Sequence, residues 1–333
     1  MSPFRHTSLL FLCLLAVGCA GVRNTPSAAA SVDQDEFGVL LMAHGGSPEW
    51  NEGVEAAVEP LQDQSKIEVA FGMADAKSIQ EAVSRLEERG VRKIGVVRLF
   101  VSGESWYERT EQILGLRPGA PPPPAATEHE HAGGHDDHSG HSGHGGGDGG
   151  GDGGGHGGHS MEFWQVKTGA SFALSRQGLA KAETMGTVLA DRARELSSDP
   201  SKEDVLILAH GPADDAENER WIAAIDKRAE AVREALPFRR VQVMTLREDW
   251  PEKREAAENR IRAFVTQAGD EGGTAIVIPF RVQGFGPYAE VLEGLDYVSD
   301  GQGLVPHSNV TQWIADQVDR LRDGSFRSPA DGT

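Results

Sequence analysis

Short hydrophobic runs alternate along the chain with longer stretches in which apolar residues recur every three or four positions. The first run, residues 38–43, is uninterrupted, as expected for a strand buried on both faces of a sheet. Predicted helices at 51–62 and 78–89 separate it from predicted strands at 67–71 and 93–100. Strands that alternate with helices at this spacing predict a doubly wound parallel sheet.

The second half of the chain repeats this plan. It begins with a strand at 204–209, and a helix at 214–235 and a strand at 241–244 follow. A helix at 252–268 and a strand at 274–280 complete the match. The predicted closing strands and helices of the two copies are 163–167 with 175–196 and 303–306 with 310–321.

Both copies open with a strand that ends in Ala-His-Gly, at His44 and His210. Self-similarity of this kind indicates internal duplication more strongly than any single motif does. We therefore predict an α/β protein of two tandem doubly wound parallel-sheet units, residues 37–199 and 200–323. A disordered tail is expected at 324–333.

One segment of the first unit has no counterpart in the second. Residues 117–160 contain a run of four prolines and then many glycines and histidines, a composition that cannot bury a core. We interpret this segment as an inserted loop.

The N-terminal segment has the features of an export signal. Residues 1–19 contain a short apolar run that ends in Leu15-Ala16-Val17-Gly18-Cys19, which resembles the lipobox of bacterial lipoproteins. This pattern predicts lipidation at Cys19, a flexible tether over residues 20–36, and anchoring to a bacterial membrane that faces the periplasm or the cell exterior. An ordinary cleaved signal with a chance cysteine is the alternative.

Composition narrows the chemistry. The chain has only two cysteines, Cys13 and Cys19, so after removal of the signal a metal would be bound by nitrogen and oxygen ligands. The formal net charge of −19 argues against nucleic acid as a partner and favours attraction of cations.

Candidate chemistry gathers at the carboxyl ends of the predicted strands, where open parallel sheets bind ligands. His44 and His210 both lie there. Outside the loop and the signal the sequence has only one other histidine, His307, which precedes Ser308 and is favoured as a helix-start residue.

The strand–Ala-His-Gly pattern at the start of two repeated α/β units resembles the type II, ATP-independent tetrapyrrole metal chelatases. The resemblance is to the CbiX-like sirohydrochlorin cobalt and nickel chelatases, with ferrochelatase-like features in the second half, and it covers residues 37–116 and 161–323. It implies insertion of a divalent metal into a tetrapyrrole without nucleotide hydrolysis. The metal would be Co²⁺ or Ni²⁺, with Fe²⁺ or Zn²⁺ as alternatives.

The resemblance also implies roles for particular residues. His210 would accept pyrrole protons or ligate the metal, and Glu290, which follows Gly284-Phe285, would be its carboxylate partner. A solvated helix carboxylate is the alternative for Glu290. His44 is the matching histidine of the first unit.

The chain departs from the family after the third strand of each unit, where the cobalt and nickel chelatases usually place a second histidine. Glu104 would then be a substitute oxygen ligand, or the first unit is a degenerate half kept for structure. Aromatic residues beside the predicted crevice would stack on a flat macrocycle or pack its walls. The candidates for substrate binding are Trp106, Tyr107, Phe285 and Tyr288.

The inserted loop suits divalent metals, because imidazole is a ligand for Co²⁺, Ni²⁺, Zn²⁺ and Cu²⁺. A flexible spacer of biased composition is the alternative. The candidate loop ligands are His129, His131, His135, His138, His141, His144, His156 and His159.

The function predicted from these features is a membrane-tethered metal chelatase whose partners are a divalent metal, a tetrapyrrole and the bilayer. A non-catalytic metal or tetrapyrrole carrier of the same fold is the alternative. A structural lipoprotein whose loop buffers metal would need neither strand-end histidine.

Overall fold

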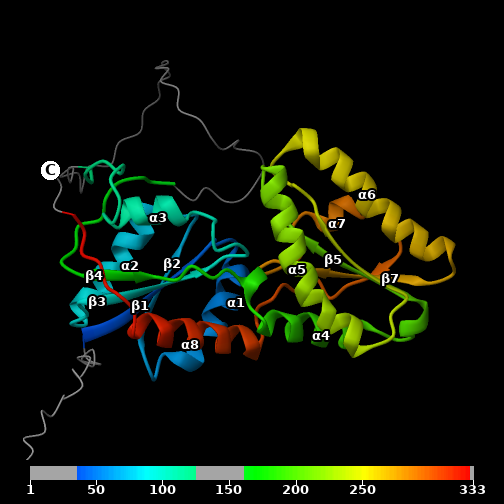
Figure 1. The fold of residues 1–333 in the computed structure, drawn as a ribbon, viewed down its shortest axis with the longest axis horizontal. Helices are drawn as coiled ribbons and strands as arrows, with labels where there is room; N and C mark the ends of the chain where they lie inside the picture. The colour runs from blue at the N-terminus through cyan, green and yellow to red at the C-terminus, as the bar shows by residue number, and fades with distance from the viewer. Residues whose placement is uncertain (1–35, 125–160, 331–333) are drawn as a thin grey trace, which may run out of the picture. The chain divides into compact units, whose positions relative to one another are not determined.

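The computed structural model describes residues 36–124 and 161–330. The predicted signal with Cys19, the tether up to residue 35 and the eight loop histidines therefore lie outside the described residues. Helices and strands follow one another in the same order in two units (Figure 1).

The first unit contains β1 (Phe37–Ala43), α1 (Pro48–Val58), a 3₁₀ helix (Glu59–Leu61), β2 (Lys66–Phe71), α2 (Ala76–Glu88), β3 (Lys93–Leu99), α3 (Tyr107–Ile113) and β4 (Ser171–Leu174). A 3₁₀ helix (Leu179–Lys181), α4 (Thr184–Leu196) and another 3₁₀ helix (Pro200–Lys202) lead to the second unit. The second unit contains β5 (Glu203–Ala209), α5 (Asp215–Ala235), β6 (Arg240–Thr245), α6 (Pro251–Asp270), β7 (Thr274–Pro279), α7 (Tyr288–Val291), β8 (Tyr297–Val298) and α8 (Ser308–Arg322).

Each unit has a four-stranded sheet of the same topology, in the order β2-β1-β3-β4 and β6-β5-β7-β8. Every pairing between these strands is parallel. The first strand of each unit, β1 or β5, pairs on both sides and is buried along its whole length. The predicted pair of duplicated parallel-sheet units is thereby confirmed.

Polar side chains fix where several helices begin. Asp75 accepts a hydrogen bond from the Ser78 amide at 2.8 Å and caps α2, and Asp214 caps α5 in the same way through the Glu217 amide at 2.7 Å. At the start of α8, the Nδ1 atom of His307 accepts from the Asn309 amide at 3.1 Å. The predicted helix-start role of His307 is confirmed.

The closing strands of both units were predicted at the wrong residues. Residues 163–167 do not pair with the sheet. The Lys167 backbone instead bonds to the Gln80 side chain, which accepts from the Lys167 N–H and donates to its carbonyl oxygen. The strand is β4 instead, and the helix after it begins only at Thr184. In the second unit β8 precedes the predicted strand 303–306.

The last helix of each sequence repeat packs against the other unit. Helix α4 follows the first unit but lies against α5 and β7, and α8 follows the second unit but lies against α1 and β3. Thr311 of α8 donates to the Ala57 carbonyl at 2.8 Å, and Gly95 of β3 leaves room for Leu321. The predicted boundary at residues 199/200 therefore divides the sequence but not the packing.

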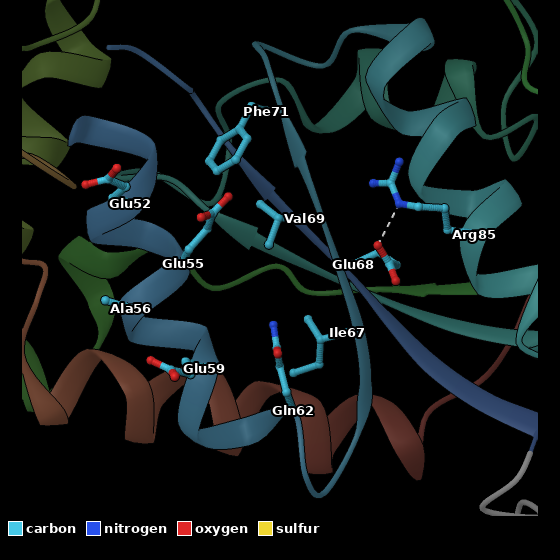
Figure 2. A pocket seen from close by; sticks show the side chains of 10 residues that line it. All are labelled: Glu52, Glu55, Ala56, Glu59, Gln62, Ile67, Glu68, Val69, Phe71 and Arg85. Carbon is cyan, nitrogen blue, oxygen red and sulfur yellow. Dashed lines mark hydrogen bonds and ion pairs between the residues drawn. The ribbon is translucent and has the colours of Figure 1, made fainter. Parts of the chain in front are cut away.

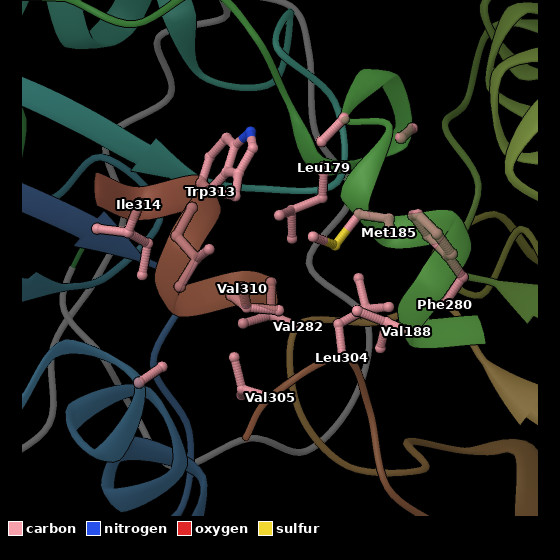
Figure 3. Packing of buried hydrophobic residues seen from close by; sticks show 14 of the residues in the cluster. Leu179, Met185, Val188, Phe280, Val282, Leu304, Val305, Val310, Trp313 and Ile314 are labelled. Carbon is pink, nitrogen blue, oxygen red and sulfur yellow. The ribbon is translucent and has the colours of Figure 1, made fainter. Parts of the chain in front are cut away.

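This exchange joins the cores of the two units. One cluster of buried apolar side chains continues from α1 and α8 over the first sheet to α4, α5 and β7 of the second. Figure 3 shows Val310, Trp313 and Ile314 of α8 together with Met185 and Val188 of α4, all of which belong to this cluster. At about 25 cal/mol per Å² of apolar surface, burial across this boundary stabilises both units together.

The segment after α8 returns to the first unit. Residue Arg327 forms an antiparallel bridge with Phe172 of β4, and its guanidinium contacts Glu111 of α3 at 2.7 Å. The prediction of a disordered tail from residue 324 is therefore wrong for residues 324–330. The charged pair and the backbone bridge were not visible in the sequence pattern.

Candidate functional site

His210 lies directly after β5, at the carboxyl end of the second sheet. Its Nε2 atom is 2.7 Å from Oδ2 of Asp249 and 3.6 Å from Oε1 of Glu248. The imidazole is half-buried, with 30 % of its side chain exposed, so part of it remains accessible to solvent.

The two carboxylates come from the loop between β6 and α6. Arg247, with a φ of 59°, turns the chain at the end of β6, and its amide donates to the His210 carbonyl at 2.7 Å. That bond ties the loop to the end of β5 and brings Glu248 and Asp249 to the imidazole. Trp250 packs its ring edge against His210, with the ring centroids 5.8 Å apart.

A guanidinium completes this cluster. Arg281 follows β7, and its Nη1 atom lies 2.9 Å and 2.8 Å from the two carboxylate oxygens of Glu248. Its carbon Cζ is 5.6 Å from the ring centroid of the fully buried Tyr288. Burial opposes the charge of Arg281, but Tyr288 and Glu248 outweigh that cost and raise the pKa of Arg281 above its ordinary value.

Asp249 is held as a carboxylate. The hydrogen bond with His210 is the main cause that lowers the pKa of Asp249, and burial opposes it. The charges of Arg281 and of His44 lower it further. His44 from the first unit thus acts electrostatically on the cluster of the second.

His44 occupies the matching position after β1 but has different neighbours. Its Nδ1 atom contacts the Gly45 carbonyl at 2.8 Å, and its ring lies 6.3 Å from that of Trp50. The loop after β2 offers one carboxylate, Asp75, which caps α2 and accepts from the Glu162 amide at 2.7 Å. The two units therefore share a fold but differ in their carboxylates.

His210, Glu248 and Asp249 form a group with the composition of a metal site. One ligand atom from each lies within 4.8 Å of the other two. Among the described residues, no other group of three histidine, aspartate or glutamate side chains comes this close together. One imidazole nitrogen and two carboxylate oxygens suit a divalent first-row metal, and three protein ligands leave positions open for water or substrate nitrogens.

The structure does not bring the other predicted ligands into this group. Glu290 lies on α7 and is exposed, and Glu104 is also exposed and contacts Arg220 of α5 at 3.3 Å. Their metal-binding roles stay predictions. The carboxylates beside His210 are instead Glu248 and Asp249, which the sequence analysis did not single out.

A signal for the missed residues was present in the sequence. Glu248 and Asp249 follow a strand that ends at the same sheet edge as β5, and Arg281 follows the next one. Open parallel sheets bind ligands at the carboxyl ends of their strands, and this rule applies to every strand end. The sequence-based prediction used it only for the histidines and for the loop after the third strand.

The candidate substrate-binding aromatics differ in exposure. Tyr288 is fully buried, and Phe285 packs against it with ring centroids 5.6 Å apart, so both belong to the wall of the second unit. The ring centroid of Tyr107 lies 4.8 Å from the guanidinium carbon of Arg98 and 4.6 Å from that of Arg176. Trp106, with 37 % exposure, presents a free ring surface.

A separate hollow of about 560 Å³ lies along α1 and β2 of the first unit (Figure 2). Glutamates of α1 line it, and Arg85 across it pairs with Glu68 at 2.7 Å. None of its lining residues belongs to the His210 group. We therefore assign the chemistry to the strand ends and not to this hollow.

Comparison with known proteins agrees with this architecture. Residues 38–120 match the CbiX protein family. No curated protein matches the chain. The matched segment is the first unit, whereas the His210 group lies in the second.

Solved structures share the fold. SirB from Bacillus subtilis with Fe³⁺ is 12 % identical and has a TM-score of 0.52, with 86 % of this chain and 96 % of that chain covered. The sirohydrochlorin chelatase SirB from Bacillus subtilis subspecies spizizenii, in complex with cobalt, is 10 % identical with the same coverage and TM-score. A multi-domain protein from Deinococcus radiodurans with structural similarity to chelatases is 18 % identical, with a TM-score of 0.50 over 88 % of this chain. This chain spans 57 % of that protein's length.

Two duplicated parallel-sheet units, with a histidine at the end of each first strand, give this chain the fold of these chelatase structures. The match of residues 38–120 to the CbiX family agrees with the resemblance that the sequence predicted. In the described ranges, no helix has the length and apolar character needed to cross a membrane.

Proposed function

We propose that this protein inserts a divalent metal into a tetrapyrrole, with sirohydrochlorin as the macrocycle and Co²⁺, Ni²⁺ or Fe²⁺ as the metal. The observation that carries the proposal is the contact of His210 Nε2 with Asp249 and Glu248 at the carboxyl end of the second sheet. The match of residues 38–120 to the CbiX family supports the same reaction.

Metal insertion requires that a cation is delivered with few waters and that two pyrrole N–H protons are removed. The carboxylate of Asp249 and the imidazole of His210 supply a negative charge and a proton acceptor at one place. Because the pKa of Asp249 is lowered, its carboxylate is available to a cation at neutral pH. His210 then alternates between contact with the metal and acceptance of a proton.

The position of His44 supports a cleft that uses both units. It follows the central strand of the first sheet and acts electrostatically on Asp249 of the second. A flat macrocycle between the two strand ends would meet a histidine from each side. The exposed ring of Trp106 is a further surface for stacking.

The alternative, a non-catalytic metal or tetrapyrrole carrier, is favoured by one observation. Arg281 already neutralises Glu248, and the loop between β7 and α7 contains no histidine. A carrier needs only reversible binding and would keep His210 without turnover.

Insertion assays under reducing, anaerobic conditions separate the two functions. Purified protein is mixed with sirohydrochlorin and Co²⁺, Ni²⁺ or Fe²⁺, and the absorbance of the metallated macrocycle is followed. We expect insertion by the wild-type protein and a loss of about 100-fold or more in His210→Ala. His307→Asn, which keeps a capping acceptor at α8, is the matched control. If the wild-type protein binds metal but inserts none, the chelatase function is excluded and the carrier function is favoured.

We also propose that the protein is exported and anchored to a membrane by a lipid on Cys19, and that the histidine-rich loop binds additional metal. The lipobox-like residues before Cys19 and the eight loop histidines support these proposals. Cys19→Ser should move the protein from the membrane fraction to the soluble fraction. Unchanged fractionation would exclude the lipid anchor.

A further inference from the structure

The ion pair between Arg281 and Glu248 bears directly on how the His210 group takes up a metal. Both carboxylate oxygens of Glu248 face the same guanidinium nitrogen, Nη1, at 2.8–2.9 Å. The pair is well shielded, because only 20 % of the Arg281 side chain and 11 % of the Glu248 side chain are exposed. A partly buried pair of this kind is screened less by salt than a surface pair.

The contact also falls on the atom that a metal would use. Glu248 Oε1, which lies 3.6 Å from His210 Nε2, is 2.9 Å from Arg281 Nη1. A metal bound to Oε1 would sit about 2.1 Å from it. The metal and the guanidinium nitrogen would then be at most about 5 Å apart, from the sum of the two distances. Two positive groups at that separation repel each other strongly in a partly buried site.

We infer that Arg281 is a resident counter-cation of the His210 group, which competes with the metal for Glu248 and keeps the site's metal affinity low. This inference rests on the proposed function, because it concerns the same metal. A divalent ion binds fully only when Arg281 gives up at least one oxygen of Glu248. A weakly held metal is what an insertion reaction needs, because the ion must leave for the macrocycle.

The surroundings of Arg281 offer its guanidinium a second partner. The hydroxyl of Tyr288 is buried and makes no hydrogen bond of standard geometry among the described residues, but its interaction with the guanidinium helps to raise the pKa of Arg281. The Tyr288 ring lies beside the guanidinium. Gly286, with a φ of 62°, passes so close that a β-carbon there would lie 2.7 Å from Cζ of Arg281. The guanidinium is therefore confined between Glu248, Tyr288 and a bare backbone, and it remains near the metal.

The test measures metal affinity in the full chain. Co²⁺ is titrated against a chromophoric chelator, and the binding that His210→Ala removes is taken as the affinity of the His210 group. This subtraction separates the site from the loop histidines. We expect Arg281→Gln to raise that affinity about tenfold or more, which is the range of outer-sphere effects on metal sites. Arg281→Lys keeps the charge and should stay close to the wild type.

Arg233→Gln is the matched control, because it removes one positive charge from an exposed ion pair of the same unit. Circular dichroism checks that each variant folds. If Arg281→Gln does not fold, the test is repeated with Arg281→Met, which introduces an apolar side chain of similar length. An equal rise in Arg233→Gln would reduce the effect to net charge and overturn the inference.

The remaining outcomes separate the inference from the proposed function. Unchanged or weaker binding in Arg281→Gln and Arg281→Met, with a His210-dependent site still present, overturns the inference alone. If His210→Ala removes no bound metal in any background, the proposed metal site fails and the inference fails with it.

Discussion

The indole Nε1 of Trp50 donates a hydrogen bond of 3.2 Å to the carbonyl oxygen of Gln283, 233 residues further along the chain. Trp50 belongs to α1 of the first unit, and Gln283 lies two residues after Arg281 in the second. The two segments approach so closely that a β-carbon on Gly53 would lie 2.6 Å from the side-chain nitrogen Nε2 of Gln283. The loop that carries Arg281 is thus held against the helix that follows His44.

Trp50→Phe tests this link. The ring remains but the hydrogen bond is lost, so we expect the free energy of unfolding to fall by about 1 kcal/mol. Insertion should fall as well, because the loop after β7 loses its tie to the first unit. Trp164→Phe, which loses a bond of 2.8 Å to Glu162 within the first unit, is the control and should leave insertion unchanged. Urea denaturation and the insertion assay measure the two effects, and equal insertion in both variants would contradict the prediction.

Asp249→Asn and Glu290→Gln separate the observed carboxylate from the one predicted by resemblance. Asp249 contacts His210 at 2.7 Å, whereas Glu290 is exposed on α7. We expect Asp249→Asn to weaken Co²⁺ binding by the His210 group about 10–100-fold, and Glu290→Gln to leave it unchanged. Competition with a chromophoric chelator gives both values. The opposite ranking would restore Glu290 as the partner of His210.

Trp313→Ala tests the exchanged helix α8. Trp313 is 3 % exposed and belongs to the cluster that continues through both units. Removal of a buried tryptophan side chain should lower the free energy of unfolding by about 3–5 kcal/mol. Because the cluster is shared, the loss should appear in both units, which hydrogen exchange in β1 and β5 can report. A loss confined to β1 would show that the units unfold separately.

Glu111→Gln tests whether the attachment of the C-terminal segment depends on pH through the Glu111 carboxylate. Burial would raise the pKa of Glu111, but hydrogen bonds and charges of Arg327 and Arg117 outweigh it and lower the pKa. A lowered folded-state pKa stabilises the protein above the unfolded value of about 4.3 and ceases to do so as pH falls through the folded value. At neutral pH the variant should be about 1–3 kcal/mol less stable than the wild type.

The difference between the two proteins should shrink as the pH falls from about 4.3 through the lower folded-state pKa of Glu111, because the wild-type carboxyl then becomes neutral like the glutamine amide. Glu108→Gln is the control, since Glu108 contacts the same Arg117 but is 66 % exposed. Thermal unfolding over this pH range measures the effect. A constant difference at every pH would mean that the charge of Glu111 does not contribute.

The sequence predicted those parts of the fold that local pattern determines. The central strand β1 is apolar along its whole length and β5 is apolar from Val205 on, and α5 begins one residue after its predicted start. Strand β4 was misplaced because Phe163 and Val166 look as apolar as Phe172, and only tertiary hydrogen bonds decide which segment joins the sheet. The exchange of α4 and α8 leaves no local pattern, because an amphipathic helix does not specify which sheet it covers.

The same distinction applies to the site. His210 was found because its position after a strand repeats that of His44. Glu248 and Arg281 do not repeat, since the first unit has Ala74 and Phe100 at the positions that the strand register matches to them. Asp75 is at the place of Asp249 but caps α2 instead. A duplicated pattern reveals what the copies share, whereas the contacts of His210 arise from residues that differ between them in identity or in partner.

The crossing of α4 and α8 sets the order in which the protein can complete its folding. Synthesis produces the first sheet early, but the helix that covers one of its faces is among the last segments made. Domains generally fold as they emerge, starting from the N-terminus. Here the first unit begun is the last one finished, so an apolar face near β3 stays uncovered until the whole chain is available. A chain interrupted anywhere before residue 308 would therefore lack α8 and leave the first unit incomplete, even if all of its strands had been made.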